Sequence, residues 1–417
     1  MNHKQKVFNG LLVKLDPVDN PPNYSVDCAN VNTFTKGALK NITGIEKQHT
    51  TAFGSSIMAM FQLKRTELFG GYILRKPTPV GTAIHNVTEL QAMQNDLAGN
   101  YYLANDIDAS DTINWNAGAG FAPVVNFAGI FDGNGHTITG LYINRPSTEY
   151  VGLFGGIVYG ADIKNVGLLD VNISGNNWVG GLTGQGGNIS VKNCYSTGAV
   201  TGNGYLVGGL VGDFTGSMEN CHSTVNIISS GNTAGGLIGR QDNSSITKCY
   251  ATGAVTGGGN MTGGLVAVSS SSRQTDCYAT GAVTGSGNDV GGLIGVVGGT
   301  NPKARTNCYS TGAVTGGGDD IGGLIGRNSS GTFNDCFWDT ETSGQATSGG
   351  GTGKTTIQMK QEATFTNWDF STIWDIVEGV SYPTITGDFS SNLLERVYDS
   401  AINKSIFCLS GSKLYLL

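Results

Sequence analysis

NCYSTGAVTG, which begins at Asn193, and VGGLVG, which begins at Val207, are two phrases that the chain repeats in the same order along much of its length. The second phrase occurs six times with small variations, and its leucines follow one another after 28, 27, 28, 28 and 31 residues. These leucines are Leu182, Leu210, Leu237, Leu265, Leu293 and Leu324. A fixed internal period of about 20 to 50 residues is typical of solenoids and other repeat arrays.

The first phrase places a cysteine in register with the leucines. Each cysteine that is followed by a copy of the second phrase precedes its leucine by 16 residues. The cysteines are Cys194, Cys221, Cys249, Cys277, Cys308 and Cys336. Alternate positions after the cysteine carry Ser or Ala, Gly or Val, and Val or Ile, which is the period of a β-strand with one small apolar face. No window within the repeats has the spacing of an amphipathic helix.

Three short strands and three turns fit into one repeat of this length. We therefore predict an all-β protein in which each repeat forms one turn of a parallel β-helix, with about seven coils whose strands stack about 4.8 Å apart. Equivalent residues then lie above one another, so the cysteines should form an interior column of thiols. The glycine pairs should supply positive φ at the corners and allow close approach of the coils.

An aromatic column should run beside the thiols. Its members are Tyr195, His222, Tyr250, Tyr278, Tyr309 and Phe337. We expect these rings to pack inward as core, because a long exposed aromatic row would promote aggregation. An outward-facing stripe that stacks on sugars is the alternative.

Composition limits the classes of function. Glycine is abundant, at 66 of 417 residues, but a hydrophobic content of 39% is enough to bury a core. The net charge of -7 and the lack of a basic run disfavour nucleic-acid binding. No apolar run is long enough for membrane insertion, and the N-terminal sequence MNHKQKVFNGLLVKLD does not resemble a secretion signal. Cysteines one coil apart favour free thiols, so we expect assembly in a reducing cytosol.

The regions outside the repeats differ in pattern. Short strand-like runs in residues 1–77 and 388–417 predict one small β domain formed by both termini, with the β-helix of residues 86–386 inserted into it. Residues 86–97 predict a capping helix whose N-cap is Thr88. An aromatic segment near the end predicts a C-terminal cap with core packing. Its residues are Phe365, Trp368, Phe370, Ile373 and Trp374.

Several motifs suggest chemistry, but each has a simpler explanation. SGGGTGKTT at 348–356 resembles a phosphate loop, yet Ser348 stands where the first glycine is required and no buried strand precedes it, so a capping loop is favoured.

Asp106, Asp108 and Asp111 could bind calcium, but turn capping is favoured because the glycine and the distal glutamate of a calcium loop are missing. Asp132, Asn134 and His136 fit a tight turn. No histidine pair or nucleophile elbow is present, and we expect no metal and no cofactor.

Three carboxylates give the strongest hint of catalysis. Asp289 and Asp320 each precede a repeat leucine by four residues, so adjacent coils would bring them about 5 Å apart, as in retaining glycosidases. Asp319 adds a third acid. An exposed turn is the favoured explanation, because the equivalent positions of other repeats carry no acid.

The repeat phrases also resemble a known family. VGGLVG, GGLIGR, NCYSTGAVTG and CFWDTETSGQATSGGGTGKTT are similar to the GLUG-motif repeats of bacterial surface and adhesin-like proteins, from about Leu90 to Ile385. The resemblance implies a β-helical, adhesive protein and brings no catalytic residue. The terminal segments resemble β domains of tail-hub proteins from tailed phages.

These observations predict a non-enzymatic structural and adhesive protein. We expect a bacteriophage virion component, of the tail or a decoration, that is assembled in the host cytoplasm and displays the β-helix for host attachment. Its expected partners are other virion proteins, a second copy through the terminal domain, and a glycan or protein of the host surface. A bacterial cell-surface adhesin is one alternative. The other is a tailspike-type polysaccharide depolymerase that uses Asp289, Asp319 and Asp320.

Overall fold

The computed structural model describes residues 79–301 and 303–386, together with five short strands closer to the termini. The chain divides into two compact units, Pro79–Thr386 and a unit formed by Met1–Thr78 with Gly387–Leu417. Strands of the second unit pair antiparallel, β1 (Lys6–Phe8) with β2 (Leu11–Val13), and β39 (Lys404–Cys408) with β38 (Glu395–Asp399) and β40 (Leu414–Leu416). The rest of the predicted terminal domain, 1–77 and 388–417, lies outside the described residues, so its arrangement stays a prediction.

The first unit begins with short strands, one α-helix and two 3-10 helices. These elements are β3 (Thr82–Ile84), α2 (Val87–Ala92), η2 (Met93–Asn95), β4 (Tyr101–Leu103), β5 (Ile107–Asp108), η3 (Ser110–Gly118), β6 (Ile130–Asp132), β7 (Thr137–Thr139), β8 (Tyr142–Asn144), β9 (Phe154–Ile157), β10 (Asp162–Lys164) and β11 (Gly167–Gly175). Strands β9, β10 and β11 pair with β12 and β13 of the repeats, and β6, β7 and β8 pair with β10 and β11, so the coils begin before the first repeated phrase.

The repeats follow as a regular series of strands. These are β12 (Thr183–Lys192), β13 (Tyr195–Gly202), β14 (Val207–Gly208), β15 (Val211–Glu219), β16 (His222–Ser223), β17 (Asn226–Ser229), β18 (Thr233–Gly235), β19 (Ile238–Asp242), β20 (Ser245–Thr247), β21 (Tyr250–Ala251), β22 (Val255–Gly257), β23 (Met261–Gly263), β24 (Val266–Ser270), β25 (Arg273–Ala279), β26 (Val283–Gly285), β27 (Asp289–Gly291), β28 (Ile294–Gly298), β29 (Ala304–Ser310), β30 (Val314–Gly316), β31 (Asp320–Gly322), β32 (Ile325–Asn328), β33 (Thr332–Asn334) and β34 (Phe337–Asp339). The unit ends with α3 (Thr340–Ser343), β35 (Thr352–Lys354), α4 (Thr356–Met359), η4 (Glu362–Thr364), β36 (Trp374–Asp375) and β37 (Thr384–Ile385).

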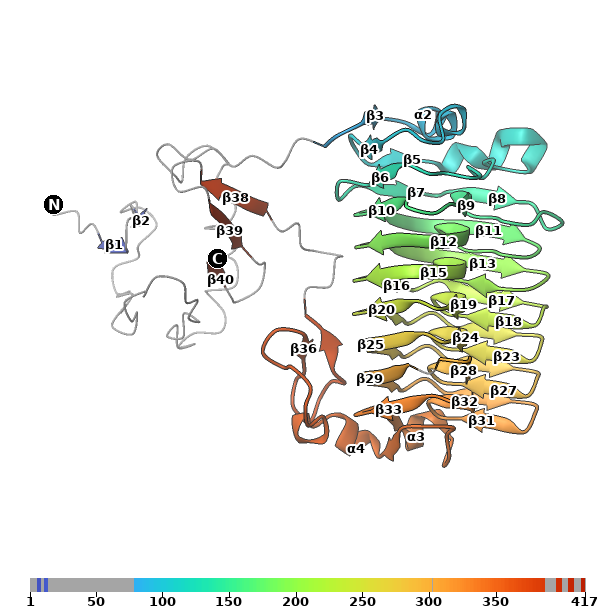
Figure 1. The fold of residues 1–417 in the computed structure, drawn as a ribbon, viewed down its shortest axis with the longest axis vertical. Helices are drawn as coiled ribbons and strands as arrows, with labels where there is room; N and C mark the ends of the chain where they lie inside the picture. The colour runs from blue at the N-terminus through green and yellow to red at the C-terminus, as the bar shows by residue number, and fades with distance from the viewer. Residues whose placement is uncertain are drawn as a thin grey trace. The chain divides into compact units, whose positions relative to one another are not determined.

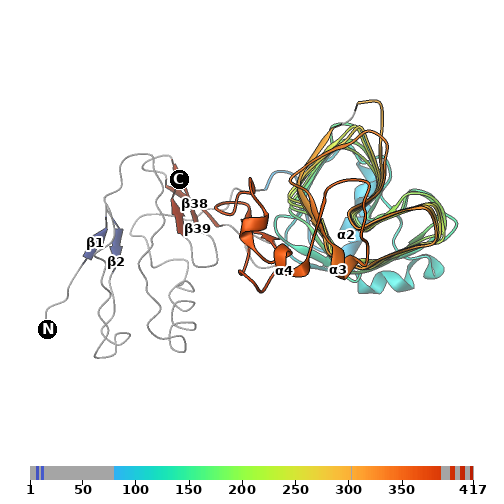
Figure 2. The ribbon, with the colours of Figure 1, turned by 90° about the horizontal axis from the view of Figure 1, so that it is seen from below.

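Equivalent strands of successive repeats pair in parallel, which confirms the predicted β-helix. Cys277 and Tyr278 of β25, for example, lie in register with Cys308 and Tyr309 of β29. The pairings produce one sheet of 28 strands and a second sheet formed by β14, β18, β23, β27 and β31. About eight turns result, stacked one above another (Figure 1). In a view along the stack the coils superpose on one outline (Figure 2).

A regular repeat contains four strands, one more than predicted. In the repeat that begins at Met261 these are β23, β24, β25 and β26. The chain bends at Gly264-Leu265, which turns the leucine side chain into the interior and separates β23 from β24.

The corner of each coil is formed by the residue that precedes the cysteine. This residue has a left-handed backbone, with φ between +52 and +54, in all six copies. The residues are Asn193, Asn220, Lys248, Asp276, Asn307 and Asp335. Asn and Asp tolerate this conformation best, and their side chains also bond from coil to coil: Asn193 donates to Asn165 (2.8 Å) and Asn307 donates to Asp276 (3.1 Å).

The glycine pairs have a different role from the one predicted for them. None of these glycines in the six copies has a positive φ. They are required by close packing of backbones, because a Cβ at Gly264 would lie 2.1 Å from the carbonyl oxygen of Gly292, and one at Gly236 would lie 2.0 Å from that of Gly264. The prediction of positive φ was wrong, and the prediction of close approach is confirmed.

The leucine column forms the centre of the interior. All six repeat leucines are fully buried, and the amide of each of the first five donates to the carbonyl of the next, for example Leu237 to Leu265 at 2.9 Å and Leu265 to Leu293 at 2.8 Å. Every leucine therefore packs on an identical neighbour, and the backbone that carries it is part of the ladder.

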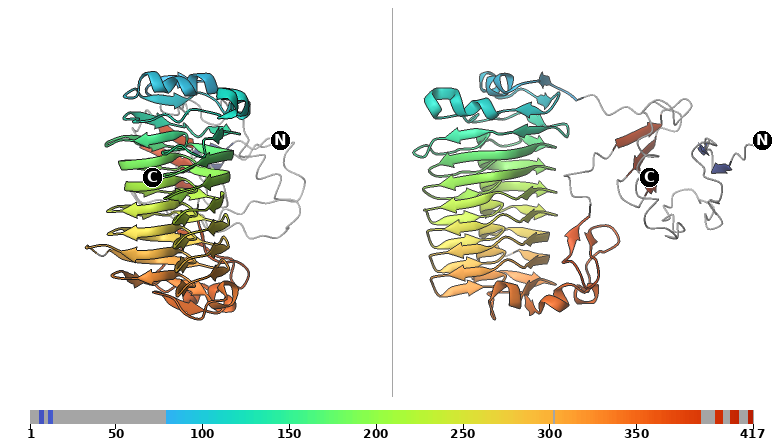
Figure 3. Two further views of the ribbon diagram at one scale, coloured as in Figure 1. Left: turned by 90° about the vertical axis from the view of Figure 1, so that its right-hand side faces the viewer. Right: turned by 180° about the vertical axis from the view of Figure 1, so that it is seen from behind.

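The first coil is covered by the predicted helix, which lies at the blue end of the stack (Figures 1 and 3). Leu90 and Met93 are buried, and Val87 and Leu97 pack against the same core. The N-cap is Asn86 rather than Thr88, because the Asn86 side chain accepts a hydrogen bond from the amide of Glu89 (2.9 Å). At the other end, β35 adds a parallel strand to β34 and closes the last coil together with α3.

Two glycine substitutions test the close approach of the coils. We expect Gly264→Ala to reduce the free energy of unfolding by about 1–3 kcal/mol, because the new methyl group overlaps a carbonyl of the next coil. Gly298→Ala is the matched control, since no atom lies within 4 Å of the added Cβ, and it should change the free energy by less than about 0.5 kcal/mol. Urea denaturation of the full chain measures both, and equal losses would contradict this account.

Candidate functional site

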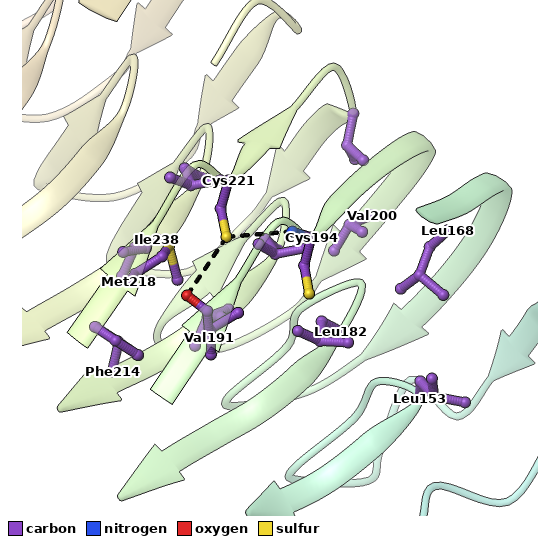
Figure 4. Packing of buried hydrophobic residues seen from close by; sticks show 14 of the residues in the cluster. Leu153, Leu168, Leu182, Val191, Cys194, Val200, Phe214, Met218, Cys221 and Ile238 are labelled. Carbon is purple, nitrogen blue, oxygen red and sulfur yellow. Dashed lines mark hydrogen bonds between the residues drawn. The ribbon is translucent and has the colours of Figure 1, made fainter. Parts of the chain in front are cut away.

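The thiol column is buried, in single file, and free of disulfides. All six repeat cysteines are at most 2% exposed. The Cys277 thiol donates to the carbonyl oxygen of Thr275, two residues before it, at 3.1 Å, and the other five make the same bond. Figure 4 shows Cys194 and Cys221 one above the other within the apolar core, where the amide of Cys194 donates to the Cys221 sulfur (3.4 Å). Burial raises the pKa of Cys221 and Cys277 well above that of an ordinary thiol, whereas, against the effect of burial, hydrogen bonds from neighbouring thiols lower the pKa of Cys249 and Cys308. Because all six thiols are buried, the column is structural.

The aromatic column is continuous, but it lies on the opposite side of its strands from the cysteines. Successive rings from Tyr195 to Tyr309 are 4.6–5.1 Å apart and within 12° of parallel. The later rings belong to a separate hydrophobic cluster formed with the C-terminal segment, not to the interior of the coils. The predicted inward direction was therefore wrong, because side chains alternate along a strand and the inward positions are taken by Cys and by Ser or Ala. The predicted burial is confirmed for the rings from His222 to Phe337, which are at most 8% exposed.

The aromatic C-terminal segment packs along the side of the last coils, as Figure 3 shows, and not across the open end as predicted. The Trp374 ring is 6.1 Å from both Tyr278 and Tyr309, and its Nε1 donates to Asp276 (3.3 Å). Trp368 Nε1 donates to the carbonyl of Asp335 (3.0 Å). Phe365, Trp368 and Trp374 are buried, while Phe370 and Ile373 are partly buried against them. The predicted core packing of this segment is confirmed.

Asp289 and Asp320 lie in register on adjacent strands, as the repeat spacing predicted. The side chain of Asp289 is only 9% exposed and receives two hydrogen bonds from Arg327, Nε to Oδ1 at 2.8 Å and Nη2 to Oδ2 at 3.1 Å. The same Arg327 Nε is 4.0 Å from Asp320, and Asp319 is exposed. Both carboxylate oxygens of Asp289 therefore accept from one guanidinium in a nearly buried position. Asp213 and Arg240 form a similar pair (2.7 and 2.8 Å).

The other sequence motifs are parts of turns and caps. Asp106 accepts from the amide of Thr137 (2.9 Å), which holds the pKa of that carboxyl below its usual range, and Asp108 accepts from the amide of Ser110 (2.9 Å). Asp111 accepts from Asn114 and Trp115 (3.0 and 3.1 Å).

The remaining turn and the phosphate-like loop are likewise structural. Asp132 accepts from the amide of Asn134 (2.8 Å), and His136 lies 3.2 Å from Asp106. In the loop, Ser348 accepts from the amide of Ile325 (2.9 Å), and Thr355 and Gln358 cap α4. Among the residues that the structure describes, no group of three metal-binding side chains is found.

A polar cluster around Arg305 lies within the later coils. Arg305 is 1% exposed; its guanidinium donates to the Lys303 carbonyl (2.8 Å) and to the Ser269 hydroxyl (2.7 Å). Its Nε and the Oε1 of Gln274 have no partner in the described part of the chain. Burial lowers the pKa of Arg305 to about 10, so this guanidinium stays charged at neutral pH.

The filled, stacked coils define a β-solenoid repeat protein. One stretch of these repeats, residues 230–256, matches the family described as "The GLUG motif", which supports the predicted resemblance to GLUG-motif proteins. Relatives include Halomucin from Haloquadratum walsbyi, 41% identical over 141 residues that are 31% of this chain and 2% of that protein. Another is a "Putative Gly-rich membrane protein" of Evansella cellulosilytica, 32% identical over 138 residues, 31% of this chain and 14% of that protein. The chain thus matches only a small part of either relative.

Among solved structures, a "putative immunoglobulin A1 protease" from Bacteroides ovatus is similar, at 20% identity and a TM-score of 0.45, over 76% of this chain and 94% of that one. None of these named relatives is a phage protein, and the resemblance of the terminal segments to tail-hub proteins stays a prediction. In the described part of the chain, no helix has the length and apolar character needed to cross a membrane.

Two functional features were not found from the sequence. Arg327 is the partner of Asp289 although it lies 38 residues further on, and only the register of the coils brings the two together. Arg305 follows Met218, Ile246 and Gln274 in one inward-facing column. When the repeats are written one below another, Arg305 falls in this interior column. A basic residue at an interior position is therefore the sequence signal that could have revealed the polar cluster.

Thiol accessibility tests the buried column. We expect no reaction of the Cys28→Ser/Cys408→Ser variant with Ellman's reagent at pH 8 over minutes, because burial excludes the reagent and disfavours the thiolate. Unfolding in guanidinium should release the six repeat thiols. Rapid reaction of any thiol in the folded protein would contradict a closed interior.

The Asp289–Arg327 pair should contribute to stability. Arg327→Gln leaves a nearly buried carboxylate with weaker partners, and we expect a loss of about 1–3 kcal/mol in the free energy of unfolding. Asp319→Asn removes an exposed charge and should change it by less than about 0.5 kcal/mol. Chemical denaturation measures both variants, and an unchanged Arg327→Gln protein would show that the clamp is not stabilising.

Proposed function

We propose that this solenoid is a non-enzymatic structural rod of a surface protein, which displays an attachment surface outside the cell. The GLUG repeats and the β-solenoid fit a structural, adhesin-like protein. The observation that carries the proposal is the filled interior: one leucine and one cysteine from every repeat occupy it, each at most 2% exposed. Such a rod gains length and lateral surface with every repeat, without needing a new core.

The acidic residues support a non-catalytic role. A retaining glycosidase needs two carboxylates that face a substrate, one of them with a raised pKa. Here Asp289 is buried and bonded to Arg327, which also approaches Asp320. The depolymerase alternative would require this guanidinium to leave before Asp289 could act.

The cell surface is favoured over a virion as the location. The relatives are named as a halomucin and a membrane protein. The virion prediction depended on the N-terminal sequence, which does not resemble a secretion signal, and on the terminal segments, most of which lie outside the described residues. A phage particle is therefore the contrasting outcome of the localisation experiment.

Localisation tests the proposal. An antibody raised against residues 79–386 should label intact cells that produce the protein, and mild proteolysis of intact cells should remove the label. Labelling that requires permeabilised cells would contradict a surface role. Recovery of the protein only in purified phage particles would instead support the virion alternative.

A second measurement tests the absence of catalysis. We expect no new reducing ends when the full chain is incubated with capsular or lipopolysaccharide glycans from the producing organism and its neighbours. Release of reducing ends by the wild-type chain, and its loss in Asp320→Asn, would establish the depolymerase alternative.

A further inference from the structure

The stack is irregular at one corner. Five residues, 299–303, separate β28 from β29, whereas two residues separate β24 from β25 in the coil before and β19 from β20 in the coil before that. These three extra residues produce the single spacing of 31 in the repeat. The insertion is not required by the interior, because Leu293 and Leu324 on either side of it stack like the others (2.8 Å).

The insertion helps to form a surface depression across three coils, which we call the corner depression. Its volume is about 250 Å³. It is lined by Asn243, Ser244, Ser245, Ser271, Arg273 and Lys303. The lining residues carry hydroxyl, amide and cationic groups, and none of them is a carboxylate or a large apolar side chain.

The two cations of the corner depression are not neutralised within the described residues. Arg273 is exposed and Lys303 is half-buried, and neither side chain takes part in an ion pair there. Four other basic side chains of the solenoid form ion pairs, among them Arg240 with Asp213 and Lys164 with Asp162.

Charge around the depression also favours an anion. The acid next to it in sequence, Asp242, does not line it, and its charge acts on Arg240. Beneath the corner, the buried guanidinium of Arg305 donates to the backbone carbonyl of Lys303 and is not paired with any carboxylate in the described residues. Three positive charges therefore meet at one corner of a protein whose net charge is -7.

The corner also offers hydroxyl groups to a ligand. The Ser271 hydroxyl oxygen accepts from the amide of Asn301 (3.3 Å), so its hydrogen can be donated outward. The Ser245 side chain lines the same wall. Cations with nearby hydroxyl donors are the groups that bind carboxylate and sulfate oxygens by charge-assisted hydrogen bonds.

We propose that the corner depression binds the carboxylate or sulfate groups of an acidic polysaccharide. The inference rests on the proposed surface function and names the chemistry of what the rod attaches to. A volume of about 250 Å³ is smaller than the pockets that enclose whole small molecules, so it suits one charged sugar residue of a chain that continues outside. Arg273 provides a forked pair of donors, and Lys303 provides a mobile point charge.

Binding of the full chain to immobilised polymers tests the inference. The probes are dextran sulfate and polygalacturonate, with neutral dextran as the control polymer. We expect binding to both acidic polymers, or to the one whose group is recognised, that weakens as salt rises, and no binding to dextran. Arg273→Gln/Lys303→Gln should weaken this binding at least 10-fold.

A charge-matched variant shows whether the position matters. Lys164→Gln/Lys192→Gln removes the same charge from lysines that are paired with Asp162 and Glu219, and it should bind within 2-fold of the wild type. Competition by inorganic sulfate shows whether the depression binds a free anion or an acidic group of a polymer. If sulfate displaces the bound polymer no better than chloride does at the same salt concentration, the polymer is the ligand.

Three results would overturn the inference: binding to neither acidic polymer, equal loss in the two double variants, or displacement by millimolar sulfate alone. Failure of the surface function would be seen separately. If intact cells are labelled by the antibody while neither polymer binds, only the ligand class is wrong. If the polymers bind through Arg273 and Lys303 but intact cells are not labelled, the site stands and the proposed location is wrong.

Discussion

The backbone hydrogen bonds between equivalent residues of successive coils are the constraint on which this structure depends. Leu265, for example, receives from Leu237 and donates to Leu293, at 2.9 and 2.8 Å. Because the register is fixed, each side chain must pack on the equivalent side chain of the next coil. A residue type that packs well at one position of a coil therefore packs well at the same position in every coil. Leucine fills the centre, cysteine fills a narrow position beside it, and glycine is required where a Cβ at Gly264 would meet a carbonyl at 2.1 Å.

The same constraint explains which parts of the fold could be predicted from the sequence. The spacing of leucines and cysteines determined the coil length and the two interior columns, since both depend only on like residues stacking. The left-handed corner at Asn193 and its counterparts was missed, although the Asn or Asp before most of the cysteines was visible. The positive φ was predicted for the glycine pairs instead, because glycine is the usual residue with that backbone conformation.

Features that depend on non-repeated segments could not be predicted in this way. The aromatic column was expected inside, because an exposed row seemed unstable; instead, Trp368 and Trp374 cover its last rings from outside. Periodicity contains no information about a segment that packs against the repeats from elsewhere in the chain.

The pairing of Asp289 with Arg327 and the burial of Arg305 likewise depend on individual coils that depart from the consensus. Departures from the repeat are therefore where the surface of one coil acquires properties that its neighbours lack.

The stacked rings have an optical consequence. Tyr250, Tyr278 and Tyr309 lie nearly parallel at about 5 Å, and the last two are each 6.1 Å from the indole of Trp374. Chromophores this close exchange excitation energy, so light absorbed by the tyrosines of these coils will be emitted by tryptophan. The protein thus contains an internal fluorescent reporter: tyrosine emission will emerge when the C-terminal segment detaches from the side of the rod, while the coils beneath it are still folded.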